Sequence, residues 1–242
     1  MSGGISFNIN YPASLISNNI SIISNIFKIS KNYKIKKLIF MSSSCVYPKN
    51  INKDLKPSYL LTKSLEDTNK AYALSKLLGI EMVKSYNIEF KLNYVSVIPS
   101  TIFGPGDNFD SYNAHVVSSL INKIHLAKVD KLKEVKLWGS GNPVRDFIYV
   151  DDLANSLIFI LENYNSSEPI NVSSGESLTI KQSSNVLKKI VNFKGKITFD
   201  KKMPDGMKRK ILDIGKIKQY GWTPENLIEE AILKTYKWYL KN

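Results

Sequence analysis

Cysteine is nearly absent from this sequence, since Cys45 is the only one among 242 residues. A single thiol cannot form an internal disulfide, which excludes a small disulfide scaffold and makes a reducing cytoplasm the expected location. No run of about 18 apolar residues occurs, so the sequence predicts no membrane-spanning helix. Residues 1–11 have no basic stretch followed by an apolar core, and we therefore expect neither a secretory signal nor a transit peptide.

Arginine is also scarce: among 34 basic residues only Arg145 and Arg209 are arginines. The formal net charge of +13 invites a nucleic-acid interpretation. The lysines, however, form short clusters without the interleaved aromatics of a surface that stacks bases, so a solvated surface is favoured and no nucleic-acid partner is expected. An arginine kept in so lysine-rich a chain suggests a bidentate contact with an acidic small molecule such as a nucleotide diphosphate, although chance also explains two residues.

Glycine-rich phosphate-binding loops are missing as well. A dinucleotide-binding domain begins with a strand, a glycine-rich turn and a helix that together hold a pyrophosphate. No two of the twelve glycines stand three positions apart, so neither GxGxxG nor GxxGxxG can be written. The sequence therefore lacks the usual cradle for a dinucleotide.

What the first hundred residues do contain is an alternation of helical and strand patterns. Apolar spacing predicts helices over 12–33 and 67–90, and short apolar runs predict strands over 37–42 and 93–98. Alternation of this kind is typical of a doubly wound parallel α/β sheet.

Beyond Phe103 the pattern becomes less regular. We expect a helix over 112–127, strands over 135–138, 147–150, 170–172 and 196–199, and a helix from Thr179. Asp151 and Asp152 are expected to cap a helix that follows them, and the last helix is expected to have Thr223 as its cap and Pro224 as its first residue. We therefore predict two parts, a Rossmann-like part over 1–103 to which some later segments return, and a smaller α/β substrate-binding part over 104–242.

Tyr72 and Lys76 stand four residues apart on a predicted helix, so one face presents both. A nearby ammonium is expected to stabilise the phenolate and to lower the pKa of Tyr72 toward neutrality. A tyrosine of this kind can exchange a proton with a carbonyl oxygen, and Ser43, at the end of the preceding strand, can donate a hydrogen bond to the same oxygen. The spacing alone also occurs by chance on many helices.

The segments around these residues resemble a known family. The triad Ser43, Tyr72 and Lys76 resembles that of the extended short-chain dehydrogenases/reductases, in the NAD-dependent epimerase/dehydratase family. A specific similarity to the GDP-L-fucose synthases, over nearly the whole chain, is carried by SSSCVYP (42–48), YALSK (72–76), GPGDNF (104–109), WGSGNPVRDFIYVDD (138–152) and PDGMKRKILD (204–213).

The resemblance implies an enzyme that epimerises GDP-4-keto-6-deoxy-D-mannose at C3 and C5 and then reduces C4 with NADPH. Tyr72 is then the acid for reduction, Lys76 its electrostatic partner and Ser43 the donor to the carbonyl. Cys45 and His115 match the pair that removes and returns the protons, a role suited to a thiolate and an imidazolium. A small strand-end cysteine and a surface histidine are the simpler alternative.

The resemblance also assigns the residues that bind ligands. No metal is implied. The residues implied for the cofactor are Ser42, Tyr72, Lys76, Pro99, Thr101, Ile102 and His115. The residues implied for the GDP-sugar are Lys123, Trp138, Arg145 and Arg209. For Arg145, an ion pair with Asp146 or Asp151 is the structural alternative.

The sequence departs from the family in ways that affect its expected activity. Residues 3–12 resemble the segment that follows the family's fourth strand, so the first two βαβ crossovers are expected to be absent, a strand edge to be exposed, and cofactor binding by the chain alone to be poor. Another polypeptide is one expected source of the missing half, and truncation is another. Ser42, Thr101 and Lys123 stand where the family usually has Gly, Asn and Arg.

The resemblance further implies a homodimer through the helices near 13–33 and 68–90. Two alternatives stay open beside the epimerase/reductase. One is a sugar-nucleotide 4-epimerase or dehydratase of the same superfamily, and the other is a non-catalytic subunit that binds sugar nucleotides.

Overall fold

The computed structural model describes residues 5–110, 114–203 and 205–242. The first of its sheets contains three parallel strands in the order β1-β2-β6. Their bounds are β1 (Lys37–Met41), β2 (Asn93–Pro99) and β6 (Ile170–Val172). Since Met41 aligns with Val97, and Pro99 with Val172, the carboxyl ends of all three strands lie at the same edge of the sheet.

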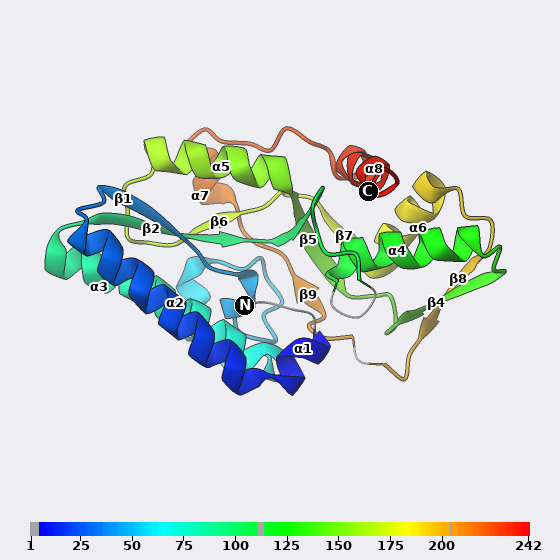
Figure 1. Cartoon of the computed structure of the whole chain (residues 1–242), viewed down its shortest axis with the longest axis horizontal. Helices are drawn as coiled ribbons and strands as arrows, with labels where there is room; N and C mark the ends of the chain where they lie inside the picture. The colour runs from blue at the N-terminus through cyan, green and yellow to red at the C-terminus, as the bar shows by residue number, and fades with distance from the viewer. Residues whose placement is uncertain (1–4, 111–113, 204) are drawn as a thin grey trace.

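Helices cover both faces of this sheet (Figure 1). On one face α2 (Pro12–Asn32) packs on α3 (Lys70–Phe90), and α3 contacts β1 and β2. On the other face lie α5 (Val150–Asn163) and α7 (Gly215–Gln219), which contact β1 and β6 respectively. The central strand β2 is buried from Tyr94 to Pro99 because it is covered on both sides. The doubly wound parallel α/β sheet predicted from the sequence is confirmed.

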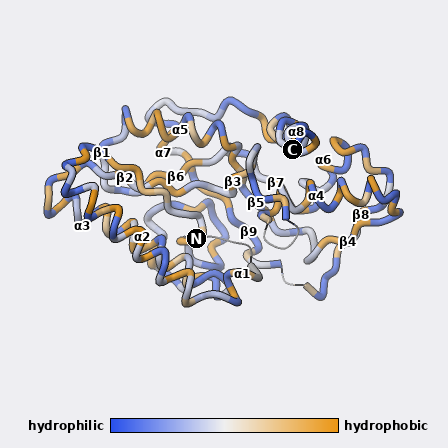
Figure 2. The backbone as a smooth tube through the Cα atoms, viewed as in Figure 1, coloured by the Kyte–Doolittle hydropathy of each residue, from blue (hydrophilic) through white to orange (hydrophobic). Residues whose placement is uncertain are grey.

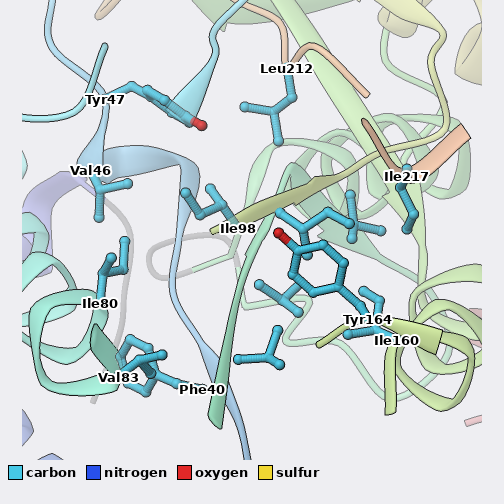
Figure 3. Close-up of a cluster of buried hydrophobic side chains, with 14 of the residues drawn as sticks. Phe40, Val46, Tyr47, Ile80, Val83, Ile98, Ile160, Tyr164, Leu212 and Ile217 are labelled. Atoms are coloured by element: carbon cyan, nitrogen blue, oxygen red, sulfur yellow. The ribbon is translucent and has the colours of Figure 1, made fainter. Parts of the chain in front are cut away.

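The core between the sheet and its helices is drawn in Figure 3, where Phe40, Ile80 and Val83 lie on one side and Ile160 and Tyr164 on the other. Hydrophobic residues run through the strands of this region in Figure 2. The helix α3 approaches β1 at a glycine, since a Cβ on Gly79 would lie 2.1 Å from Cζ of Phe40. A glycine inside a helix costs about 1 kcal/mol relative to alanine, and here the close approach to the Phe40 ring requires it.

A second group of strands and helices follows along the longest axis of the molecule (Figure 1). The strand β5 (Val144–Tyr149) pairs with β3 (Thr101–Phe103), with antiparallel β7 (Ser177–Thr179) and with β9 (Arg209–Lys210). A parallel pair is formed by β4 (Glu134–Trp138) and β8 (Lys196–Asp200).

Three helices pack with these strands and share a second hydrophobic core. They are α4 (Val116–Val129), α6 (Ile180–Val191) and α8 (Ile228–Tyr239). Late residues such as Leu212 and Ile217 belong to the first core instead. The division of the chain at residue 103 stays a prediction.

Four short helical segments complete the elements. They are α1 (Ile5–Asn10), η1 (Ser44–Val46), η2 (Pro57–Tyr59) and η3 (Asp67–Asn69).

Buried polar side chains join the late residues to the first sheet. The amide of Asn171, on β6, donates to the carbonyl oxygens of Leu55 (2.7 Å) and Asp213 (3.0 Å), and its oxygen accepts from the hydroxyl of Tyr47 at 2.6 Å. The carboxylate of Asp146, on β5, accepts from the backbone N–H of Leu212 at 2.9 Å and from the hydroxyl of Ser173. These bonds fix the segment that contains β9 beside β5.

The expected start of the last helix is wrong. The helix α8 begins at Ile228 with Leu227 as its N-cap, five residues after the expected cap Thr223. The carboxylate of Asp152 accepts from the backbone N–H groups of Glu225 (3.1 Å) and Asn226 (3.4 Å), which holds this stretch out of the helix.

Two other expected helix starts also differ from the structure. Asp151 and Asp152 do not cap α5, whose N-cap is Tyr149, and both lie in its first turn. The helix expected over 112–127 begins at Val116, and residues 111–113 lie outside the part of the chain that the structure describes.

Apolar side chains remain exposed on the helices α2 and α3. On α2 they stand at helical spacing and form one stripe, made of Ile22, Ile26 and Ile29 together with the C-cap residue Tyr33. On α3, Leu74 and Leu78 are exposed one turn apart. The strand β1 lies at the edge of its sheet and pairs with β2 alone among the strands of the described ranges. None of the helices in those ranges is both long and apolar enough to span a bilayer.

The carboxyl group of Asp146 should make the stability of the fold depend on pH. The group is 2% exposed, and burial raises its pKa to about 7, against the hydrogen bonds that lower it. The folded chain then keeps this proton between pH 4 and 7, whereas the unfolded chain loses it near pH 4, so stability falls as pH rises through this window. We expect guanidinium denaturation to show that the free energy of unfolding of the wild type falls between pH 5 and pH 8. In Asp146→Asn this fall should be smaller by about 2 kcal/mol.

The exposed Asp130, at the end of α4, provides the control. Asp130→Asn should keep the pH dependence of the wild type. An Asp146→Asn variant with that same dependence would contradict the assignment.

Candidate active site

The site begins where β1 ends. The backbone N–H of Ser42 donates to the carbonyl oxygen of Val97 at 2.8 Å, which extends the pairing with β2 by one residue. The chain then turns into η1, and the hydroxyl of Ser43 caps this turn by accepting from the N–H of Cys45 at 3.3 Å. Serine is a preferred residue at such a position because its short side chain reaches the free N–H groups. Ser43 and Cys45 are therefore fixed at the carboxyl edge of the sheet.

The helix α3, which contacts η1, brings Tyr72 and Lys76 to the same place. Ser43 lies close enough to Tyr72 to act on the pKa of its phenol through a hydrogen bond. The ammonium of Lys76 donates to the carbonyl oxygen of Met41 at 3.0 Å and lies 5.8 Å from the centre of the Tyr72 ring. The structure thus brings together Ser43, Tyr72 and Lys76, which the sequence could only place on separate elements.

The expected lowering of the pKa of Tyr72 is wrong. Burial raises the pKa of this phenol to about 12, the nearby Cys45 adds to the rise, and the hydrogen bond with Ser43 opposes it. Burial also lowers the pKa of Lys76, whose nearest hydrogen-bond acceptor is the carbonyl of Met41 and not the phenol oxygen. At neutral pH Tyr72 is therefore a protonated group that can donate, and desolvation outweighs the distant ammonium.

Two residues that the sequence analysis did not select contact the sulfur of Cys45. Sγ accepts from the Nδ2 amide of Asn69 at 3.3 Å and from the ammonium of Lys210 at 3.3 Å. Asn69 is the N-cap residue of α3, and Lys210 belongs to β9. Asn69 stands three residues before Tyr72 and Lys210 directly follows Arg209, but no pattern in a single sequence distinguishes them from their neighbours.

His115 is the N-cap residue of α4, and its side chain is exposed. Only Ala114 separates it from residues 111–113, which the structure does not describe. Within the described ranges no hydrogen bond or ring contact joins His115 to Cys45 or to Tyr72. Its pairing with Cys45 stays a prediction.

Arg145 holds a loop in place. Its guanidinium donates to the carbonyl oxygens of Val144 (2.9 Å), Met207 (2.7 Å) and Asp205 (3.3 Å). The carboxylate of Asp205 in turn accepts from the N–H and the hydroxyl of Ser140. Burial lowers the pKa of Arg145, while Asp205 and Cys45 raise it, so the guanidinium lies in the field of both groups.

The ion pairs considered as the alternative for Arg145 are not seen in the described part of the chain. The carboxylate of Asp146 is used by Ser173 and Leu212, and Asp151 makes no ion pair with this guanidinium.

The other predicted substrate residues lie in two places. Lys123, on α4, places its ammonium 5.4 Å from the centre of the Trp138 ring on β4, and that indole is 59% exposed. Burial lowers the pKa of Lys123. Arg209 forms an ion pair with Asp54, and its buried Nε has no partner among the described residues. The structure therefore joins Lys123 with Trp138 and directs Arg209 toward Asp54.

Apart from His115 at the start of α4, the predicted cofactor residues lie along the carboxyl edge of the sheet. Pro99 ends β2, and Thr101 and Ile102 form β3 immediately after it. Between them, the buried hydroxyl of Ser100 has no hydrogen-bond partner in the described chain. Lys76 uses one of its three N–H donors on Met41. These unused polar groups fit the nicotinamide end of NADP, while the glycine spacing needed for its pyrophosphate does not occur in the sequence.

A metal site is not indicated. Among residues 5–110, 114–203 and 205–242, no cluster of three or more His, Cys, Asp or Glu side chains could hold an ion.

An open parallel sheet with a Ser, Tyr and Lys constellation at its carboxyl edge defines a class of nucleotide-dependent enzymes acting on carbonyl groups. The comparison with known sequences agrees. Residues 1–173 match the NAD dependent epimerase/dehydratase family, and the chain belongs to this family.

Within the family, the chain is 41% identical over 240 residues to GDP-L-fucose synthase 1 of Arabidopsis thaliana, covering 99% of this chain and 74% of that protein. A GDP-L-fucose synthetase from Naegleria fowleri bound to NADP matches with a TM-score of 0.91 at 30% identity, over 96% of this chain and 74% of that one. A GDP-6-OMe-4-keto-L-xylo-heptose reductase from C. jejuni matches with a TM-score of 0.93 at 28% identity, over 100% of this chain and 80% of that one. The resemblance stated from the sequence is confirmed.

The contacts of Arg145 with the carbonyl oxygens of Asp205 and Met207 predict that this residue orders the segment 205–210. A lysine keeps the charge, but its compact ammonium lacks the planar fork with which the guanidinium reaches these separate carbonyls. We expect Arg145→Lys to speed amide hydrogen exchange in this segment by about tenfold, the effect of losing one or two hydrogen bonds. Exchange measured by mass spectrometry would check this, with Lys208→Met as control, since the Lys208 side chain is exposed. Unchanged protection in Arg145→Lys would show that the loop is ordered by other contacts.

Proposed function

We propose that this chain carries the catalytic groups of an NADPH-dependent 3,5-epimerase/4-reductase that converts GDP-4-keto-6-deoxy-D-mannose to GDP-L-fucose. The observation that carries the proposal is the meeting of Ser43, Cys45 and Tyr72 at the end of β1. The similarity to GDP-L-fucose synthases over 99% of the chain supports the choice of substrate.

The reduction uses Tyr72 as its acid. The phenol gives its proton to the C4 ketone oxygen as C4 becomes a secondary alcohol, and it then regains a proton from water. NADPH, when bound, supplies the hydride that C4 receives. A pKa of about 12 keeps Tyr72 protonated at neutral pH, the state that this step needs. Ser43, which lies beside Tyr72, directs a second donor to the same oxygen.

The epimerisation uses the same ketone as an electron sink. A base takes the proton from C3 or C5, and the electron pair moves into the carbonyl, where Ser43 and Tyr72 stabilise the oxyanion. An acid then returns a proton to the opposite face, so no net proton is gained or lost. We assign the base to Cys45 and the acid to His115. A thiolate must stay reduced for this role, and we therefore propose a reducing compartment such as the cytoplasm.

The GDP moiety has basic and aromatic groups within the second part of the chain. Lys123 and Arg145 provide positive charge for the diphosphate, and the exposed ring of Trp138 provides a surface on which a flat group can stack. Arg209 is assigned to the same region.

The cofactor needs more than these 242 residues supply. We propose that a glycine-rich strand-turn-helix segment, joined to this chain or carried by another polypeptide, pairs with the free edge of β1. Two observations support this: β1 pairs on one side only among the described strands, and the chain spans 74% of the length of its Arabidopsis thaliana relative.

A simpler reaction, reduction of a GDP-4-keto sugar without epimerisation, is the second candidate. The observation in its favour is the exposed position of His115, with no contact to Cys45 in the described chain, together with the likeness to the C. jejuni reductase.

The two candidates give different results in heavy water. The assay uses GDP-4-keto-6-deoxy-D-mannose and NADPH, with the glycine-rich segment of the Arabidopsis thaliana relative joined ahead of residue 1. We expect Tyr72→Phe to slow NADPH oxidation by about 10²–10⁴-fold, since it removes the proton donor. Cys45→Ser should abolish deuterium incorporation at C3 and C5, as read by mass spectrometry and NMR.

Tyr220→Phe is the matched control, because Tyr220 is an exposed tyrosine that contacts the ring of Tyr164. It should keep both activities. Reduction without deuterium incorporation by the wild type would replace the first candidate by the second, and the absence of both reactions would exclude each of them.

We also propose a homodimer through α2 and α3, supported by the exposed stripe Ile22, Ile26, Ile29 and Tyr33. An apolar stripe on a surface helix is typical of an interface. We expect light scattering to give twice the mass of one chain, and Ile26→Lys to give the mass of one chain. Lys28→Ala, an exposed position on another side of the same helix, should leave the dimer intact. A monomeric wild type would contradict the proposal.

A further inference from the structure

The sulfur of Cys45 lies between two N–H donors that come from distant parts of the chain. The amide nitrogen of Asn69 and the ammonium of Lys210 are both 3.3 Å from Sγ. Asn69 stands 24 residues after Cys45, and Lys210 stands 165 residues after it. A neutral thiol is a weak acceptor, whereas a thiolate is negatively charged and accepts readily. Two N–H donors that converge on one sulfur, one of them positively charged, favour its negatively charged form.

The orientation of Asn69 agrees with this. Its Nδ2 faces the sulfur, while its Oδ1 is buried and has no hydrogen-bond partner in the described chain. A protonated sulfur could donate to an amide oxygen, but the amide presents its nitrogen. Leaving a buried oxygen unpaired is costly, and a hydrogen bond from Nδ2 to a charged sulfur can offset that cost.

The charges around the sulfur have the same sign. The titratable groups that face Cys45 are Lys210 from β9, Arg145 from β5 and Tyr72 from α3. Tyr72 is protonated and neutral at neutral pH, so the two cations dominate. The carboxylate of Asp54 is paired with Arg209.

We propose that Lys210 and Asn69 are positioning residues that hold Cys45 as a thiolate. Neither residue needs to touch the substrate for this role. The use of the thiolate as a base rests on the proposed function, but the state of the sulfur can be measured without substrate or cofactor.

The measurement is the rate at which iodoacetamide alkylates the protein between pH 6.5 and pH 9.5. The thiolate displaces iodide from the reagent, and because Cys45 is the only cysteine, intact mass reports this group alone. A cation raises the fraction of thiolate at low pH but lowers the nucleophilicity of each thiolate. Removing the cation should therefore slow alkylation below the point of half-ionisation and speed it above that point.

We expect Lys210→Met to react about threefold more slowly than the wild type at pH 7 and about threefold faster above pH 9. Asn69→Asp, which replaces the donor by an anion of the same shape, should shift the profile in the same direction. Lys208→Met removes an exposed cation two residues from Lys210 and should overlay the wild type. Lys210→Arg, which keeps the charge, should restore most of the reactivity at pH 7.

Two results would overturn the proposal. One is a Lys210→Met profile that overlays the wild type, and the other is a rate raised by the same factor at every pH, as expected if the loop had only loosened. If Lys210→Met does not fold, as judged by circular dichroism, the comparison of Asn69→Asp with wild type decides. The sugar assay separates this inference from the proposed function. If the pH profiles of Lys210→Met and wild type cross but no deuterium enters the sugar, this inference holds and the epimerase is rejected. If deuterium enters the sugar but the two profiles overlay, the epimerase holds and this inference is rejected.

Discussion

The position of β9 against β5 is the constraint on which the site depends. β9 has only two residues, too few to fix its own register by side-chain packing. The register instead follows from Asp146, whose carboxylate accepts from the N–H of Leu212 two residues beyond β9. With the segment anchored there, Lys210 reaches the sulfur of Cys45 while its neighbour Arg209 reaches Asp54. A shift of one residue would turn Lys210 to the other face and take its ammonium away from the sulfur.

The site combines a part that is local in sequence with a part that is not. Ser43, Cys45, Tyr72 and Lys76 come from one strand, one turn and one helix in succession, and Gly79 allows that helix to lie close to the strand. Lys210 comes from the far end of the chain. The local part sets up the proton donor, since burial keeps Tyr72 neutral, whereas the distant part brings positive charge to the sulfur. In the proposed reaction, the acid would thus depend on desolvation and the base on a nearby cation.

The sequence predicted the elements whose pattern is strong and local. The helix α2 begins at Pro12 as expected, and β1 and β2 follow the apolar runs KLIFM and NYVSVI closely, because burial on both faces leaves a continuous apolar pattern. The start of α8 was not predictable, since the amides after Pro224 are held by Asp152, more than seventy residues away. The contact of Lys210 with Cys45, and the direction of the pKa shift of Tyr72, depend on pairing and burial that no spacing within one segment encodes.

The return of late segments to the first core affects how the chain can fold as it is synthesised. Asn171 joins β6 to Leu55 and Asp213, and Leu212 and Ile217 complete the packing around β2. While a ribosome makes the chain, the strands β1 and β2 emerge well before these partners, and at about 5–20 residues per second the wait is on the order of ten seconds. The nascent chain must keep an unfinished apolar sheet out of contact with its neighbours for that time, so its yield in a cell should depend on chaperones as much as on the stability of the finished fold.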